Sequence, residues 1–336
     1  MTTILYITFS KRTPAEYYRD ASVIYRCFQP CEYWRTSGYQ CFVMHHDDAA
    51  LRLVDADVVV FHRPRTTESF RVLRAHYASR RCIADYDDCL FDSAILDSHP
   101  ALLSGTTSLR LLKQQTAEYF DAFVQFDTFC VSTDGIKQSI NSLQPSATTF
   151  VVRNGISPFW KNLGGLSPLT NDKKVISYFS GTANHSADLA LHLESIVEAT
   201  QNRDNLEVHV YGKLKLNRPL PAGWRRLEPV AFHLLPQLIR QSWICIAPIG
   251  DTPFNRCKSA IKFLESACFG NPLITQPLPE FARLANPGLI LLNDNWKAAI
   301  DELMNDEHYA HAASAARELA SQHLVAFQMT EMAQWI

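Results

Sequence analysis

The stretch KVISYFSG (174–181) is the most informative about the fold, because it restarts in mid-chain a pattern that the N-terminus already shows. It is a short, largely apolar run that ends at a glycine, and a helical pattern follows it over residues 186–201. At the N-terminus, ILYITFS (4–10) is followed in the same way by a helical segment that extends to Gly38. Short buried strands that alternate with helices are typical of parallel sheets. The sequence therefore predicts an α/β protein in which this architecture occurs twice.

The rest of each half continues the alternation. Further strands are expected over residues 39–44, 56–62, 81–88, 122–133 and 149–155, and then over 206–212, 226–232, 243–250 and within 272–281 and 288–295. Between the halves, residues 157–174 contain two prolines and two adjacent glycines, as a linker would. We expect two Rossmann-like, doubly wound domains facing a cleft, over 1–160 and 175–310, with a linker over 161–174. A helical segment over 311–336 is a candidate to pack back on the first domain.

Length and composition narrow the class of protein. The 336 residues exceed what one core usually organises, which agrees with two domains. The 32 basic and 34 acidic residues leave a formal net charge of −2, so overall charge gives no reason to expect nucleic-acid binding. The nine cysteines are odd in number and lie mostly in apolar segments, as in a reduced protein. With no recognisable signal peptide or membrane-spanning stretch, we expect a cytoplasmic protein; peripheral membrane contact is compatible with the sequence but is not indicated by it.

Several common site motifs are missing. No G-x-G-x-x-G follows a strand, which disfavours a dinucleotide-dependent dehydrogenase, and there is no G-x-x-x-x-G-K-[S/T], which excludes a P-loop. Cys27 and Cys31 lie four apart, but without a second pair at ligand spacing they do not define a zinc site. We therefore expect neither a cofactor nor a metal.

The segment FNRCKSAIKFLESACFG (254–270) combines two helical stripes. Apolar residues recur at i, i+3 and i+7, while Lys258, Lys262 and Glu265 form a polar stripe on another face. With Ser259 as the N-cap and Gly270 just past the end, the helix has a defined start and stop. Spacing alone leaves two interpretations open: an ordinary solvated face with a Lys–Glu pair, or a binding face with two cations and a carboxylate.

Four segments together resemble the GT-B glycosyltransferases, specifically the family-4-like group. They are DYDDCLFD (85–92), VVRNGI (151–156), SYFSGTANHSADL (177–189) and APIGDTPFNRCKSAIKFLESACFGNPLI (247–274), of which the last is the most specific. Their order and spacing also match, and the resemblance covers nearly the whole chain. It implies a GT-B fold with a nucleotide-sugar donor held mainly by the second domain, and it favours the binding-face interpretation of the polar stripe.

The resemblance also implies a set of donor-binding residues. These would be Gly181, Thr182, His185, Asn255, Lys258, Ser259, Lys262 and Glu265. Gly181 would let the backbone approach a diphosphate, which the following helix N-terminus also attracts. Lys258 would neutralise the leaving diphosphate, and Glu265 matches the glutamate that receives the two ribose hydroxyls. The alternatives are a plain N-cap for Ser259, a surface lysine for Lys262 and an ordinary helix-start residue for His185.

One position departs from the family's pattern. The related enzymes often carry a first glutamate eight residues before the second, and this chain has Cys257 there. Because that glutamate usually faces the donor sugar, the sugar contacts are expected to differ, for example through backbone groups of residues 252–255. We interpret Cys257 as a small core or cleft thiol, since the sequence offers no adjacent base that would make it a nucleophile.

The first domain is expected to hold the acceptor. Tyr18 and Arg19, which follow the first strand, and Arg63, which ends another, are the candidates, with surface or salt-bridge roles as the alternative. The D-x-D pattern Asp85-Tyr86-Asp87 is the one with which the other large glycosyltransferase fold binds a divalent metal, but a turn rich in aspartate explains it equally well.

Because this motif lies in the first domain, away from the donor features, we expect catalysis that is independent of metal. Asp87 and Asp88 are expected to line the cleft, and Asp88 is the candidate to orient or deprotonate the acceptor hydroxyl. The predicted catalytic residues are therefore Asp88, Asp87 and Lys258.

These inferences predict a glycosyltransferase for a hexose or a related sugar. It would move the sugar from a nucleotide-sugar co-substrate to a hydroxyl of a glycan or lipid-linked glycan, in surface polysaccharide biosynthesis. The alternative is a non-catalytic nucleotide-sugar-binding partner subunit of a glycosyltransferase complex, because the first glutamate is missing. A GT-B phosphorylase or epimerase is disfavoured by chain length or by missing motifs.

Overall fold

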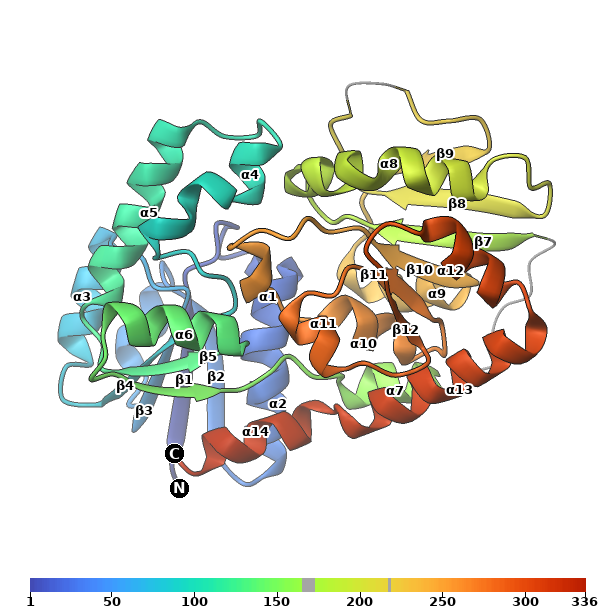
Figure 1. The fold of residues 1–336 in the computed structure, drawn as a ribbon. Helices are drawn as coiled ribbons and strands as arrows, with labels where there is room; N and C mark the ends of the chain where they lie inside the picture. The colour runs from blue at the N-terminus through green and yellow to red at the C-terminus, as the bar shows by residue number, and fades with distance from the viewer. Residues whose placement is uncertain (165–172, 217–218) are drawn as a thin grey trace.

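The structure is a computed structural model that describes residues 1–164, 173–216 and 219–336. Two α/β domains lie side by side (Figure 1). Each contains one six-stranded sheet, and all strand pairings within the two sheets are parallel. The prediction of two doubly wound domains is confirmed.

The first sheet has the strand order β2-β1-β3-β4-β5-β6. Its strands are β1 (Thr3–Thr8), β2 (Gln40–His45), β3 (Val58–His62), β4 (Arg81–Tyr86), β5 (Thr128–Val131) and β6 (Thr148–Val151). Leu5 and Ile7 of β1 face a layer formed by α3 (Glu68–His76), α5 (Leu109–Phe123) and α6 (Asp134–Leu143). Ile4 and Tyr6 face the opposite layer, which contains α1 (Ala21–Val23) and α2 (Gln29–Thr36). Burial on both faces explains why these strands are uninterrupted apolar runs.

The second sheet has the order β12-β11-β10-β7-β8-β9. Its strands are β7 (Lys174–Phe179), β8 (Leu206–Tyr211), β9 (Trp224–Leu227), β10 (Ile244–Ala247), β11 (Leu273–Thr275) and β12 (Leu289–Leu291). One face packs against α8 (Ser186–Thr200) and α12 (Trp296–Leu303). The other packs against α9 (Leu235–Arg240), α10 (Ile261–Ala267), α11 (Pro279–Arg283) and α13 (Asp306–Gln322).

The chain crosses between the domains twice, and the two crossings touch. After β6 it leaves the first domain past Ile156, and it returns at Leu324, which forms a parallel bridge with Ile156. The last helix, α14 (Val325–Ala333), buries Met329 among residues of the first sheet and its helices, and Figure 1 shows it running beneath that domain. The expected linker is partly helical, because α7 (Pro158–Gly164) occupies its start; its residues 165–172 lie outside the described residues.

The segment after β1 is less regular than one continuous helix. A 3₁₀ turn (Tyr17–Arg19) precedes α1, and a π-helical turn over Ile24–Phe28 separates α1 from α2. Pro30 accounts for part of this irregularity, since it lacks the N–H that would bond the carbonyl of Arg26 inside the π turn.

The strand expected over 122–133 is also shorter than predicted. Residues 122 and 123 complete α5, and β5 begins only at Thr128. An apolar run by itself does not distinguish a buried helix end from a buried strand. Among the described residues, no helix is long and apolar enough to cross a membrane.

Candidate functional site

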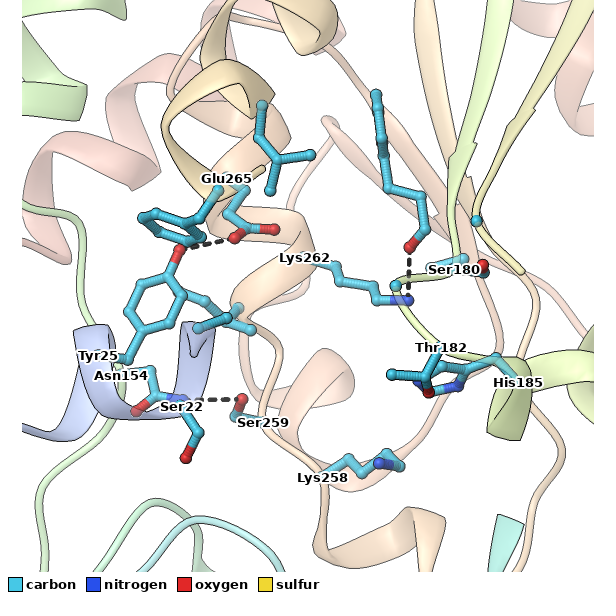
Figure 2. A pocket seen from close by; sticks show the side chains of 18 of the residues that line it. Ser22, Tyr25, Asn154, Ser180, Thr182, His185, Lys258, Ser259, Lys262 and Glu265 are labelled. Atoms are coloured by element: carbon cyan, nitrogen blue, oxygen red, sulfur yellow. Dashed lines mark hydrogen bonds between the residues drawn. The ribbon is translucent and has the colours of Figure 1, made fainter. Parts of the chain in front are cut away.

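A cavity of about 500 Å³ lies between the domains, where strands of both sheets end. In open α/β sheets this carboxyl edge is the place where ligands bind. Figure 2 shows side chains of both domains around this pocket. Most of the predicted site residues line it: Arg19, Arg63, Asp87, Asp88, Gly181, Thr182, His185, Lys258, Ser259, Lys262 and Glu265.

Two predicted residues do not line this cavity. The Tyr18 side chain is largely exposed and carries the guanidinium of Arg19 over its ring. Asn255 is buried, and its amide donates hydrogen bonds to the Asp188 carboxylate and to the Gly250 carbonyl, each at 3.0 Å. Asn255 therefore fixes the loop beside the cavity instead of facing a ligand there.

The loop after β7 presents backbone to the cavity. Gly181 has φ +72°, a left-handed conformation that favours glycine, and a Cβ at this position would meet no atom within 4 Å. The helical turn Ala183–His185 and then α8 follow, and no side chain caps the start of that turn. Its first N–H groups and its dipole can therefore receive an anion.

His185, in the same turn, is held by a contact of 3.2 Å between its Nδ1 and the Asp188 carboxylate. Burial, followed by the charge of Lys262, lowers the pKa of His185 to about 4. The ring is therefore neutral at physiological pH and adds no positive charge to the cavity.

Two lysines from one segment face this loop. Lys262 Nζ donates to the carbonyl of Phe179 at the end of β7 (3.1 Å), as Figure 2 shows. Burial, followed by the charge of Lys258, lowers the pKa of Lys262 to about 8. Lys258 Nζ lies 3.6 Å from Asp88 Oδ1, across the domain boundary. Lys262 is thus a lining residue of the cavity, and the alternative of a surface lysine does not describe it.

Glu265 lies one helical turn beyond Lys262, and its carboxylate is partly occupied from the other domain. The Tyr25 hydroxyl donates to Glu265 Oε1 at 2.6 Å. Burial raises the pKa of Glu265 to about 7, against the opposing effects of the Tyr25 hydrogen bond and the charge of Lys262. The carboxylate therefore titrates near neutral pH, and among the described residues no protein group donates a hydrogen bond to its Oε2.

Ser259 is not the N-cap that the sequence suggested. α10 begins at Ile261, its N-cap is Ala260, and no side chain caps it. Ser259 Oγ instead accepts a hydrogen bond from Asn154 Nδ2 of the first domain (3.2 Å). Lys258 likewise precedes the helix, at the end of a 3₁₀ turn over Asn255–Cys257, so the polar stripe is only partly helical.

On the opposite wall, Asp87 and Asp88 are held by cations. Arg63 donates to both carboxylates, to Asp88 at 2.8 Å. Ser22 Oγ donates to Asp87 at 2.6 Å, and His62 Nε2 lies 3.7 Å from the same carboxylate. Burial would raise the pKa of Asp87, but the charge of Arg63 outweighs burial and keeps this pKa well below its usual range.

Asp85 does not share a site with Asp87. It is buried, and both of its oxygens receive hydrogen bonds from the Arg26 guanidinium, at 3.0 and 2.6 Å. Residues two positions apart in a strand face the same side. The strand ends at Tyr86, however, so Asp87 is free of this alternation and turns toward the cleft. The D-x-D pattern therefore serves a buried ion pair and a cleft wall, not a common metal site.

Cys257 points away from the cavity. It is buried within the core cluster of the first domain, and its carbonyl accepts from Thr133 Oγ1 at 2.8 Å. Its thiol hydrogen-bonds with that of Cys89, which lowers the pKa of Cys257. This placement fits the interpretation of Cys257 as a core thiol.

A second cavity of about 640 Å³ adjoins the first, on the side of α4 (Pro100–Leu103) and α5. The two share Asp20, Arg63, Asp88, Thr182, His185 and Lys258. Its wall mixes apolar side chains such as Leu111 and Phe254 with hydroxyl and amide groups such as Thr106 and Gln115. The junction of the two cavities is thus bounded by charged groups from both domains.

One group of residues has metal-ligand spacing elsewhere among the described residues: His45, His46 and Asp47. Both ring nitrogens of His45 already have backbone partners, Ser10 O and Asp47 N, each at 3.2 Å. The Asp47 carboxylate accepts from Ser69 Oγ at 2.6 Å. Turn chemistry accounts for this group.

Several cavity residues were not predicted from the sequence, above all Ser22, Tyr25 and Asn154. Tyr25 lies in the π turn and meets a carboxylate 240 positions along the chain. No local pattern encodes that encounter. Residues after the first strand are expected to face the cleft. This general rule indicated the region, but it led to the prediction of Tyr18 instead of Tyr25.

The two-domain architecture and the cavity between the domains define the GT-B fold. The solved structure of Anabaena HepE in complex with UDP and glucose superimposes with a TM-score of 0.64 at 13% identity, over 100% of this chain and 99% of that one. Sucrose-phosphate synthase from Thermosynechococcus elongatus gives 0.63 at 10% identity, over 100% and 99%. The predicted GT-B fold is confirmed.

The fold by itself does not settle the reaction. A protein described as a UDP-N-acetylglucosamine 2-epimerase from Listeria monocytogenes also matches, with a TM-score of 0.53 at 15% identity over 100% of this chain and 97% of that one. No protein-family model matches the sequence, and no curated protein does. Function must therefore be argued from the side chains of the site.

Proposed function

We propose that this protein is a glycosyltransferase of the family-4-like type. It transfers a sugar, such as a hexose, from a nucleotide-sugar donor to a hydroxyl of a glycan or lipid-linked glycan. The observation that carries the proposal is the wall formed by Lys258, Lys262 and Glu265, which faces the Gly181 loop across one cavity. A carboxylate and two cations in this order suit the ribose and the diphosphate of a nucleotide.

The nucleoside end of the donor is assigned to Glu265. A carboxylate can accept hydrogen bonds from two vicinal hydroxyls, and no protein group within the described part of the chain donates to Oε2. The base would lie beside the apolar side chains of Val230, Phe232 and Ile261, which line the same cavity. HepE and the pneumococcal transferase GtfA were solved with UDP, so UDP-sugars are the first donors to test.

The diphosphate is assigned to the Gly181 loop, Lys262 and Lys258. As the bond between the anomeric carbon and the diphosphate breaks, negative charge develops on the leaving oxygen. Lys258 and the N–H groups at the start of the turn before α8 stabilise that charge. Because these groups supply the positive charge, we propose that no divalent metal is needed.

The acceptor is assigned to the second cavity. It opens onto the first at Asp88, Arg63 and Lys258, so an acceptor hydroxyl there can reach the anomeric carbon. The hydroxyl, amide and apolar groups of its wall suit a sugar ring, whose faces are apolar and whose edges are polar.

Release of nucleoside diphosphate from a panel of nucleotide sugars tests the proposal. The wild-type protein should cleave at least one donor, with water or methyl glycosides as acceptors and with a chelator present. Lys258→Ala should lower the rate by about 10²-fold or more, as expected for a group that stabilises the transition state. The matched control is Lys297→Ala, an exposed lysine of α12 that pairs with Asp301.

The same panel of nucleotide sugars distinguishes a glycosyltransferase from the alternative, a non-catalytic nucleotide-sugar-binding subunit. The side chain of Cys257 is buried, so this position offers no polar group to the donor sugar, which favours a nucleotide-binding partner subunit without catalysis. Such a subunit would bind the nucleotide with the affinity of an enzyme but release none from any nucleotide sugar. Phosphate-dependent turnover would instead indicate a phosphorylase.

A further inference from the structure

Tyr25 brings a side chain of the first domain to the carboxylate that is assigned to the ribose. Its hydroxyl donates to Glu265 Oε1 at 2.6 Å across the domain boundary (Figure 2). The residue is 6% exposed, and its ring packs edge-on against the ring of Phe232, with the two centroids 5.4 Å apart. Both aromatic side chains line the cavity. Because Glu265 is assigned to the donor's ribose, any role of Tyr25 toward it rests on the proposed function.

The hydrogen bond between Tyr25 and Glu265 can act on a nucleotide in two opposite ways. If the hydroxyl stays on Oε1, it fixes the carboxylate and leaves Oε2 and a further lone pair of Oε1 for the ribose hydroxyls. If the hydroxyl instead occupies the place of a ribose hydroxyl, an incoming nucleotide has to displace it. The surroundings of Tyr25 favour the first of these.

Tyr25 is held firmly in its place. It lies in the π-helical turn that separates α1 from α2, and turns of this kind are frequent at functional sites. The next residue, Arg26, anchors the turn: its guanidinium donates to both oxygens of Asp85, at 3.0 and 2.6 Å, and to Asn154 Oδ1 at 3.2 Å. Asn154 in turn donates to Ser259 of the second domain at 3.2 Å. Two adjacent residues of one turn are therefore tied to the opposite wall, and displacement of the Tyr25 ring would disturb both links.

The hydroxyl also affects the charge of the carboxylate. Burial raises the pKa of Glu265 to about 7, while the Tyr25 hydrogen bond and the charge of Lys262 act in the opposite direction. The thiol of Cys245 on β10 is a further titratable group that interacts with this carboxylate. A donor to a carboxylate favours its ionised form, which is the form that accepts ribose hydroxyls. Burial, followed by the charge of Glu265, raises the pKa of Tyr25 well above its usual range, so the phenol remains a donor.

We propose that Tyr25 is a positioning residue for the donor, which holds the Glu265 carboxylate from the opposite domain in the orientation that receives the ribose. The Tyr25 hydroxyl stays on Oε1 in the nucleotide complex, and the ribose hydroxyls donate to Oε2 and to the remaining lone pair of Oε1. Selection for ribose is then shared between the domains: Glu265 accepts the hydroxyls, and Tyr25 sets the direction of the carboxylate.

The test compares Tyr25→Phe with the wild type in binding UDP, or whichever nucleoside diphosphate stabilises the wild type most, and the 2′,3′-dideoxy form of the same nucleotide at pH 7.5. Phenylalanine keeps the ring beside Phe232 and removes only the hydroxyl. The affinity for UDP should fall by about 3–10-fold, the usual effect of one hydrogen bond. The affinity for the dideoxy nucleotide should stay within about twofold, because that ligand has no ribose hydroxyl to donate to Glu265. Its binding also shows that the variant is folded.

The matched control is Tyr77→Phe. Tyr77 is another buried tyrosine of the first domain; its hydroxyl donates to the Leu51 carbonyl at 2.6 Å, and it lines neither cavity. This variant should lose some stability and keep both affinities.

The pH dependence shows whether Tyr25 acts through Glu265. The affinity for UDP-glucose should fall on acidification as Glu265 becomes protonated, and Tyr25→Phe should move this fall to higher pH, because the carboxylate loses a donor that favours its ionised form. Tyr77→Phe should leave the profile where it is in the wild type.

Three results would overturn the assignment. Tighter binding of UDP by Tyr25→Phe would show that the hydroxyl competes with the ribose. Equal losses for UDP and its dideoxy form would show that the hydroxyl only shapes the cavity, and an unchanged affinity and pH profile would show that it has no role in binding. Failure of the proposed function looks different, since the wild type itself would then bind no nucleoside diphosphate.

Discussion

The affinity of the cleft for a nucleotide sugar should pass through a maximum between about pH 7 and pH 8. Two groups set its limits: burial raises the pKa of Glu265 to about 7, and burial together with the neighbouring Lys258 lowers the pKa of Lys262 to about 8. Ribose hydroxyls donate to the ionised carboxylate, so affinity falls as pH drops through 7. Phosphate oxygens accept from the protonated amine, so affinity also falls as pH rises through 8.

The size of the effect follows from the linkage between protonation and binding. One pH unit below its pKa, about nine-tenths of Glu265 is protonated, and the affinity should be about tenfold lower, or about 1.4 kcal/mol. The upper limb has the same slope above the pKa of Lys262. An intact nucleotide sugar is the suitable ligand, because a free terminal phosphate titrates near pH 6 and would confuse the lower limb.

Calorimetric titrations of the intact nucleotide sugar between pH 5.5 and 9 provide the measurement, because its diphosphate does not titrate in this range. Glu265→Gln should remove the acidic limb and keep the alkaline one, while Lys262→Met should do the reverse. A nucleoside without phosphates should show the acidic limb only. Glu198→Gln, on the exposed side of α8, is the control. A flat profile between pH 6 and 7 in the wild type, or an acidic limb that persists in Glu265→Gln, would refute this reasoning.

The remaining predictions concern the groups around the cleft. Without nucleotide at pH 8, Glu265→Gln should raise the melting temperature, because the raised pKa of Glu265 means that its ionised form destabilises the fold above that pKa. Arg26→Met should cost about 3–5 kcal/mol in chemical denaturation, since it leaves Asp85 buried without its partner; a loss below about 1 kcal/mol would contradict this. In Gly135→Ala the new Cβ would lie 2.9 Å from the backbone oxygen of Arg256, so the domains should separate slightly, with a loss of about 1–3 kcal/mol and slower turnover; unchanged melting and turnover would show that the interface yields easily. Activity should survive excess chelator, and loss that manganese or magnesium restores would show that a metal takes part.

The strands and their order of appearance could be predicted from the sequence because they are buried on both faces. ILYITFS and KVISYFSG are apolar enough to be recognised without any knowledge of their neighbours. The donor wall could also be anticipated, since Lys258, Lys262 and Glu265 lie within eight positions, although only Lys262 and Glu265 belong to one helix.

The facing wall could not be anticipated, because its contacts join distant parts of the chain. Tyr25 meets Glu265, and Asn154 meets Ser259, through the packing of two domains rather than through local spacing. The N-cap role of Ser259 was wrong for the same reason: its hydroxyl is engaged across the domain boundary, and the helix begins two residues later. Hydrogen bonding of this kind depends on how the domains meet, which local patterns do not record.

Thermal unfolding in the presence of nucleoside diphosphates shows whether the cleft binds a nucleotide. A ligand at 100 times its dissociation constant stabilises the folded state by about 2.7 kcal/mol, which raises the melting temperature measurably. At least one nucleoside diphosphate should stabilise the wild type at pH 7.5, and Glu265→Ala should abolish this stabilisation. If no nucleotide at millimolar concentration shifts the wild-type transition, the cleft is not a nucleotide-sugar site, and the proposed glycosyl transfer is contradicted.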